Sequence, residues 1–300
     1  MKTLTIYLLE KGFNHASIYT MSKCIERFEN YLTTQKIKPE QCTYNDLTGY
    51  IQFLAKKGLI QRSIQQNMGV LKHYFNYLKS ENEEIVNPVQ HLDIKGVEKE
   101  KIHDIIPLEV LEFMLENYPT QQHLLEKIPL TATQHRNKLI LSLFIHQGLT
   151  TTDLKELRIE NVELRKGCIN VPESRKINPR ILPLNPNQIL DLQEYIMIHR
   201  EALLLESKED TDKLIVSNNG GKHGVQNTLA YLQKDVKKLV PTLQDFKQIR
   251  ASKIQRWLSE YGLRKTQYLA GHRFVSSTER YQKNDIEELQ NELEKYGLTL

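Results

Sequence analysis

Residues 243–285 read LQDFKQIRASKIQRWLSEYGLRKTQYLAGHRFVSSTERYQKND and carry the most informative pattern in the chain. Lys247 and Arg250 are three residues apart in a helical pattern, so both side chains project from one helix face. Further along, a glycine permits the left-handed turn that aims His272. A short helix then carries Tyr281. The segment therefore places two cations, a histidine and a phenol on successive helices.

These residue types together suit phosphoryl transfer. A tyrosine hydroxyl is a poor nucleophile at neutral pH because its ordinary pKa is about 10. Cationic groups beside it would stabilise the phenolate and the charged phosphorane that it forms on a phosphodiester. Taken singly, the cations are most often solvated helix charges, the histidine a turn residue and the tyrosine part of a core. Only their order and spacing together point to a site.

The composition is that of a folded chain that buries a core. The 300 residues are 26% charged and 39% hydrophobic, which excludes a disordered chain and a small disulfide scaffold. The net charge of +4 permits a nucleic-acid partner without requiring one. Three distant cysteines predict neither disulfides nor a zinc site. Because no apolar run suits a secretory signal or a membrane span, we expect a cytoplasmic protein.

The first third of the chain predicts a bundle of helices. Apolar residues recur at spacings of three and four in three segments, 17–35, 44–57 and 61–80. Asn45 or Asp46 is expected to cap the second helix. A polar stretch over 81–101, with an Asn-Pro step in its middle, is interpreted as a linker. We therefore place an all-helical domain at 1–98 and a second domain at 99–300.

The second domain is predicted to be mostly helical with a small β-sheet. Two β-type runs flank a polar turn from Ser174 to Pro179, as in a hairpin. Helices are expected at 108–117, 135–148, 150–157, 186–204 and, after a short strand at 213–218, along the remaining chain to Gly297. Phosphate-loop, dinucleotide-binding, zinc-protease and serine-hydrolase motifs are missing from the sequence, so we do not expect a nucleotide-hydrolysing or dinucleotide-dependent enzyme.

The C-terminal pattern resembles that of the tyrosine recombinase (phage integrase, Xer-like) family. That family shows His-x-x-Arg, then Gly-His, then a tyrosine nine residues after the histidine. Here the corresponding residues are Lys247, Arg250, Gly271, His272 and Tyr281.

Upstream blocks extend the resemblance over nearly the whole chain. The family's Gly-Leu-Arg and Ser-Glu match Gly148-Leu149 and Thr152-Asp153. Its hairpin Arg-x-x-Pro-Leu matches Arg180 and Pro183-Leu184, with Arg175-Lys176 before it. The N-terminal helices resemble the family's core-binding (SAM-like) domain. The resemblance implies a mainly α fold with a small sheet in the catalytic domain.

Two positions depart from the family pattern. Lys247 replaces the first histidine, and a lysine still donates to a phosphate oxygen. Thr150 replaces the first catalytic arginine, and losing such a donor costs roughly 10²–10³ in rate. One hypothesis is that Arg175 supplies the missing guanidinium; the alternative is that it only contacts the DNA backbone. The match to the family's hairpin fixes the alignment only to within one residue, so Arg175 and Lys176 could exchange these roles.

The resemblance implies a mechanism without metal or cofactor. Tyr281 would form a 3′-phosphotyrosyl link, while Arg250, Lys247 and His272 hold the phosphate oxygens. Lys176 would protonate the leaving 5′-oxygen. Double-stranded DNA is the implied partner, bound by a homotetramer on two duplexes, and the enzyme would be the integrase of a bacterial mobile element.

Basic residues along the chain are expected to contact DNA. They are Lys56, Lys57, Arg62, Lys72, Arg180 and Lys253. A C-terminal helix over 285–294 would dock on a neighbouring protomer or on its own domain. Because of Thr150, a DNA-binding architectural relative with impaired cleavage is the alternative function. A type IB topoisomerase shares the chemistry but is disfavoured by the short chain and the N-terminal domain.

Overall fold

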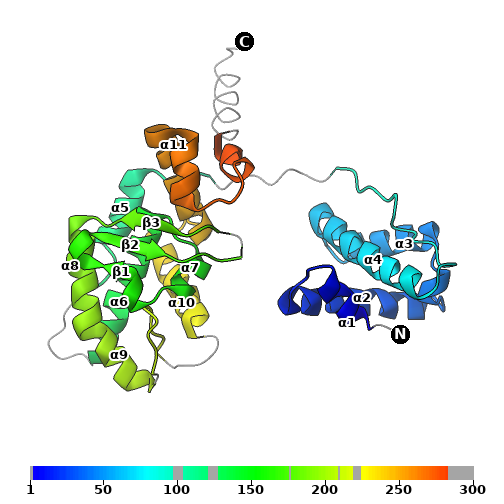
Figure 1. The fold of residues 1–300 in the computed structure, drawn as a ribbon, viewed down its shortest axis with the longest axis horizontal. Coiled ribbons are helices and arrows are strands. Elements are labelled where there is room, and N and C mark those ends of the chain that lie inside the picture. The colour runs from blue at the N-terminus through cyan, green and yellow to red at the C-terminus, as the bar shows by residue number, and fades with distance from the viewer. Residues whose placement is uncertain are drawn as a thin grey trace, which may run out of the picture. The chain divides into compact units, whose positions relative to one another are not determined.

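The computed structural model describes residues 3–96, 104–120, 128–175, 177–208, 210–218 and 224–282. The chain divides into two compact units, Met1–Glu100 and Lys101–Leu300, next to the boundary proposed from the sequence. Both units are built mainly from helices, and a small sheet lies in the second (Figure 1). The predicted fold class is confirmed.

The N-terminal unit packs four helices around an aromatic core. They are α1 (Leu4–Glu10), α2 (His15–Thr34), α3 (Tyr44–Lys56) and α4 (Gln61–Glu81), with a 3-10 turn at Pro39–Gln41. Phe28 of α2 meets Tyr50 and Phe75 edge-on, and all three rings are buried. Helix α1 is an addition to the sequence prediction, because its seven residues are too few to show a helical period.

The cap of α3 differs from the prediction. Thr43 is the N-cap: its hydroxyl accepts from the backbone N–H of Asp46, whose carboxylate accepts in turn from the N–H of Thr43. Asp46 is therefore the third residue of a capping box, and Asn45 lies inside the helix.

The second unit combines a three-stranded antiparallel sheet with helices. The strands β1 (Val162–Glu163), β2 (Cys168–Val171) and β3 (Arg180–Pro183) lie in chain order. The helices are α5 (Leu108–Glu116), α6 (Ile128–Gln147), α7 (Thr151–Glu156), α8 (Pro186–Glu194), α9 (Arg200–Ser207), α10 (Gly224–Leu239) and α11 (Phe246–Ala270). Short 3-10 turns cover Ile159–Asn161 and Leu164–Lys166, and a π-helix covers Tyr195–His199 between α8 and α9. The buried helix α6 contacts α8, α9 and α11.

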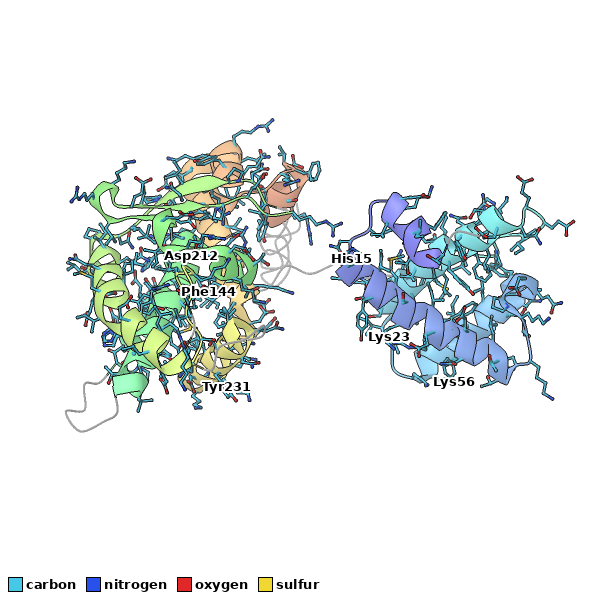
Figure 2. The ribbon with its side chains drawn as sticks, turned by 60° about the horizontal axis from the view of Figure 1, so that its bottom comes forward. His15, Lys23, Lys56, Phe144, Asp212 and Tyr231 are labelled. Carbon is cyan, nitrogen blue, oxygen red and sulfur yellow. The ribbon has the colours of Figure 1, made fainter. Side chains whose placement is uncertain are left out.

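The core of this unit lies around α6 and the start of α11. Phe144 stacks on Phe246 with ring centroids 4.5 Å apart, and Figure 2 shows Phe144 inside the unit. The prediction of a strand at 213–218 is wrong. Lys213 makes only an isolated bridge with Arg158, while the next three residues are buried as irregular chain. An apolar run signals burial as readily as it signals a strand.

Helix α11 is interrupted at Gly262, whose φ of 71° and ψ of 179° lie outside the helical region. The interruption separates the segment that carries Arg250 from the segment that ends at Ala270. The helix predicted at 285–294 lies outside the described residues. Among the helices that the structure describes, none is both long and apolar enough to cross a membrane.

Candidate active site

Helix α11 carries Arg250 into the interior of the second unit. The carboxylate of the N-cap, Asp245, accepts from the N–H groups of Lys247 and Gln248 and fixes the start of the helix. Lys247 is exposed, while Arg250 is buried one turn further on. Burial, followed by the positive charge of Arg180, lowers the pKa of Arg250 to about 10. Arg250 therefore stays protonated at neutral pH.

Two backbone carbonyls hold the Arg250 guanidinium. Nη1 donates to the carbonyl of Gly148, just after α6, and Nη2 donates to the carbonyl of Ala270 at 2.7 Å. These contacts join the ends of two helices to one cation. The guanidinium is thus fixed in place before any substrate binds.

Gly271 turns the chain so that His272 meets this guanidinium. Its φ of 68° is left-handed, which favours glycine. Nε2 of His272 lies 3.5 Å from Arg250 Nη2, and its Nδ1 lies 2.8 Å from Thr278 Oγ1. A guanidinium has no acceptor, so Nε2 accepts and Nδ1–H donates to Thr278. Burial and then the nearby arginines, Arg250 first, lower the pKa of His272 to about 4, so the ring is neutral at pH 7.

The next helix brings Tyr281 beside this histidine. Residues 276–282 are helical, and Tyr281 packs against the core of the unit. Its ring lies nearly parallel to that of His272, at 13°, with centroids 6.1 Å apart. The structure thus brings together the arginine, histidine and tyrosine that the sequence singled out.

The β2–β3 hairpin reaches the same turn. The N–H of Asn178 donates to the carbonyl of Gly271 at 2.8 Å, and Arg273 Nη2 donates to the carbonyl of Ser174 at 2.9 Å. Arg175 is exposed on this hairpin tip. Lys176 lies outside the described residues. The backbone of the tip is therefore held against the turn that carries His272.

Thr150, at the position of the missing arginine, has a structural role. It is the N-cap of α7, where its hydroxyl accepts from the N–H of Asp153 at 3.1 Å. The Asp153 carboxylate accepts from the N–H of Thr150 at 2.8 Å and from Arg180 Nη2 at 2.9 Å. The threonine therefore caps a helix and presents no charge to the site.

The burial of Arg180 corrects one prediction. Its side chain is 0% exposed and that of Asp153 is 1% exposed. Arg180 is therefore not available to contact DNA, contrary to our prediction. The period-two pattern of β3 turns it inward, and its charge is neutralised by Asp153. Nε and Nη1 of Arg180 and Oδ1 of Asp153 are buried without a hydrogen-bond partner among the described residues. A Cβ on Gly271 would lie 2.9 Å from Nη1, so Arg180 lies directly beneath the turn.

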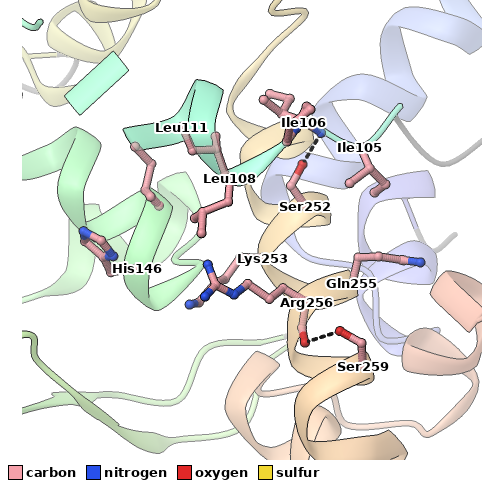
Figure 3. Close-up of a pocket in the computed structure, with 12 residues that line it drawn as sticks. Ile105, Ile106, Leu108, Leu111, His146, Ser252, Lys253, Gln255, Arg256 and Ser259 are labelled. Carbon is pink, nitrogen blue, oxygen red and sulfur yellow. Dashed lines mark hydrogen bonds between the residues drawn. The ribbon is translucent and has the colours of Figure 1, made fainter. Parts of the chain in front are cut away.

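Lys253 lines a cavity of about 370 Å³ beside the site. Figure 3 shows it with His146 and Arg256 facing the apolar residues that precede α5 and begin it. Lys253 Nζ lies 5.3 Å from the centroid of the Trp257 ring, and burial lowers the pKa of Lys253. Lys253 is therefore half-buried rather than a free surface cation.

The predicted DNA contacts of the N-terminal unit fall in two places. Lys56, Lys57 and Arg62 lie at the junction of α3 and α4, where Lys57 Nζ is 4.6 Å from the centroid of the Phe53 ring. Lys72 is ten residues beyond Arg62, or about 15 Å along α4. The three lysines are exposed and Arg62 is half-buried.

Sequence reasoning missed three groups at the site. Thr278, which fixes the tautomer of His272, stands in a run of hydroxyl residues after Gly-His that offered a weak signal. The carbonyls of Gly148 and Ala270 carry no residue-specific signal, since any residue supplies a carbonyl.

Comparisons with known proteins match both units of the chain to one family. Residues 118–288 match the phage integrase family, and residues 2–82 match the phage integrase N-terminal SAM-like domain. The chain is 26% identical to tyrosine recombinase XerC of Bacillus subtilis, over 97% of this chain and 93% of that protein. It is also 26% identical to XerC of Thermodesulfovibrio yellowstonii, over 94% and 90%.

Solved structures share the fold. XerH recombinase in a post-cleavage complex with difH DNA superposes with a TM-score of 0.73 at 18% identity, covering 98% of this chain and 83% of that one. A lambda integrase tetramer on a Holliday junction gives 0.65 at 13% identity, over 92% and 74%. Because the integrase match covers more than half of the chain, the protein belongs to the phage integrase family and is a tyrosine site-specific recombinase.

Proposed function

We propose that the protein cleaves and rejoins double-stranded DNA through Tyr281 in the bacterial cytoplasm. The Tyr281 oxygen attacks the scissile phosphorus, the bond to the 5′-oxygen breaks, and a 3′-phosphotyrosyl link forms. Arg250 and Lys247 bind the non-bridging oxygens, and Lys176 protonates the leaving 5′-oxygen. The 5′-hydroxyl of a partner strand later reverses the reaction.

The observation that carries this proposal is the clustering of Arg250, His272 and Tyr281 around the Gly271 turn. It also refines the role expected for His272. With Nδ1–H donated to Thr278, Nε2 is an acceptor. We therefore propose that His272 Nε2 exchanges its contact with Arg250 Nη2 and takes the proton of Tyr281, rather than donating to a phosphate oxygen.

Covalent trapping tests the nucleophile. A binding site is first selected from random duplex DNA, and a nicked version of it is incubated with the full chain. Wild-type protein should form an adduct that survives denaturing electrophoresis, and Tyr281→Phe should form none. Tyr231→Phe, on the exposed face of α10, is the matched control and should react normally. An adduct that persists in Tyr281→Phe refutes the assignment.

We further propose that Arg175 supplies the second guanidinium. The support is its exposed place on a hairpin tip that is hydrogen-bonded to the Gly271 turn. Arg175→Ala should slow adduct formation by roughly 10²–10³. If Arg175→Ala binds DNA with wild-type affinity, the slower reaction reflects the loss of a catalytic group and not the loss of a contact with the DNA backbone. A wild-type cleavage rate in Arg175→Ala would disprove the role.

The capping role of Thr150 favours one alternative function, a DNA-binding relative with impaired cleavage. Wild-type protein that binds the selected site but forms no adduct would establish that alternative. The proposed reaction also needs four protomers on two duplexes. Sedimentation of the Tyr281→Phe protein with a Holliday junction should show a complex of four chains.

The genetic role that we propose is the integration of a mobile element. DNA repeats that flank the gene, and that match the selected binding site, would support it. Lys56, Lys57 and Lys72 are proposed to contact DNA phosphates from the N-terminal unit. Replacing each by alanine should reduce the dependence of binding on salt concentration by about one ion per contact.

A further inference from the structure

A cluster of metal-ligand residues lies far from the recombinase site. His135 of α6, Glu194 of α8 and His199 of the π-helix present ligand atoms that all lie within 4.8 Å of one another. His135 is thirteen residues before Gly148, or about 20 Å along the direction of α6. The cluster therefore shares no side chain with the site that we assign to Tyr281.

The π-helix creates this juxtaposition. In an α-helix, residues five apart point about 140° away from each other. The π-helix over Tyr195–His199 carries the N–H of Arg200 to the carbonyl of Tyr195, five residues back. This wider turn brings His199 back toward Glu194, and π-helices occur frequently at functional sites. Helix α6 runs beside this segment and adds His135 (Figure 1).

The distances suit a tetrahedral ion. His199 Nε2 and Glu194 Oε1 are 3.3 Å apart. Two ligand atoms at about 2.0–2.1 Å from one zinc ion, in tetrahedral geometry, are separated by about 3.3 Å. The imidazole rings of His135 and His199 stack with centroids 3.9 Å apart, at 20°. Binding of an ion by both histidines therefore requires one ring to turn out of the stack, so that both nitrogens point at the ion.

One atom of the cluster has no role without a ligand. Nε2 of His135 is buried and lacks a hydrogen-bond partner among the described residues. An imidazole nitrogen without a hydrogen-bond partner is free to bind a metal.

The cluster supplies one negative charge to an ion, from the carboxylate of Glu194. Asp191 and Lys138 are the neighbouring charged groups, since the charges of both act on His135. The three ligands leave the fourth position of a tetrahedral ion to water.

We propose that His135, Glu194 and His199 form a zinc-type metal site that fastens α6 to the segment joining α8 and α9. The sequence contains no Cys-x-x-Cys motif, so we expected no zinc site from it. His135 lies 59 residues before Glu194 and 64 before His199, so the set of ligands leaves no spacing signal. The site is structural, and its occupancy is independent of DNA cleavage.

Metal titration of the full chain tests the proposal. The protein is stripped with a chelator and titrated with Zn²⁺ in competition with a chromophoric chelator, and then with Co²⁺ while the visible absorption is recorded. We expect one equivalent to bind, an intense Co²⁺ spectrum of tetrahedral type, and a higher thermal midpoint with Zn²⁺. Glu194→Gln and His199→Gln should each weaken binding at least tenfold.

His91→Gln, an exposed histidine of the N-terminal unit, is the matched control and should bind as the wild type does. The Glu194 side chain is 42% exposed, so Glu194→Gln should fold. If His199→Gln does not fold, the Zn²⁺ affinity of Glu194→Gln alone tests the site. Absence of Zn²⁺ binding in the wild type, or equal affinity in Glu194→Gln, would overturn the proposal. The titration contains no DNA, so its result does not depend on the recombinase reaction.

Discussion

Replacing Arg180 by methionine should destabilise the second unit by about 3–5 kcal/mol, the usual cost of removing one partner from a buried ion pair. Arg180 Nη2 donates to Asp153 Oδ2 at 2.9 Å, and the two side chains are 0% and 1% exposed. Methionine fills much of the same volume but leaves the carboxylate buried against an apolar chain. Oδ1 of Asp153 already lacks a partner among the described residues, so the carboxylate would keep only the N–H of Thr150 and the more distant charge of Arg250.

Urea unfolding followed by tryptophan fluorescence measures this loss. Trp257 is the one tryptophan of the sequence and lies buried in the same unit, so its signal reports that unit alone. With an unchanged m-value, the midpoint should fall by at least about 1 M urea. Ile181→Thr, on the exposed face of the same strand, should change stability by less than about 1 kcal/mol.

A double variant isolates the charge from the packing. Arg180→Met with Asp153→Asn removes both charges, and the asparagine oxygen still accepts from the N–H of Thr150. It should therefore be more stable than Arg180→Met alone. A loss below about 1 kcal/mol for Arg180→Met, or simple additivity in the double variant, would refute the reasoning.

Three further predictions concern the cap, the histidines and the turn. Thr150→Ala should cost about 1 kcal/mol in the same unfolding assay and Thr150→Ser much less, because serine, unlike alanine, keeps a hydroxyl that accepts from the N–H of Asp153 in the first turn of α7. His146 and His272 have pKa values lowered from 6.5 to about 4, so the unfolded chain binds more protons between these pH values and stability should fall as pH falls from 6.5 to 4. After allowance for screening by water, each contributes about 2 kcal/mol across that window, and His146→Gln should flatten the measured slope. Gly271→Ala should abolish adduct formation while DNA binding persists, because its Cβ would lie 2.5 Å from Ile177 Cγ2 at a φ of 68°.

The sequence predicted those parts of the molecule that depend on periodicity and motif order. The helices around Phe28 and Phe144 and the grouping of Arg250, His272 and Tyr281 follow from patterns within one segment or from known spacing. Arg180 could not be assigned correctly from its neighbours. Its burial depends on Asp153, 27 residues away, and a charged residue on a strand is ordinarily exposed.

The short strand predicted near Leu214 failed for a related reason. Local β propensity does not show whether a partner strand lies alongside, and this segment is covered by side chains instead. The π-helix at Tyr195 is likewise invisible in a sequence that reads as one continuous helical pattern. Contacts between distant segments decide both cases.

The two carbonyls that hold Arg250 have a consequence for how the site meets its substrate. They lie at the C-terminal ends of α6 and α11, where each helix carries about half a negative charge. The guanidinium is thus dehydrated when the chain folds. Its hydrogen-bond partners in these contacts are carbonyl dipoles and not a carboxylate. An arriving phosphate therefore need not displace a carboxylate or strip a hydration shell from this group. Folding has borne most of the cost of dehydrating the cation, and the attraction that remains is available to the transition state.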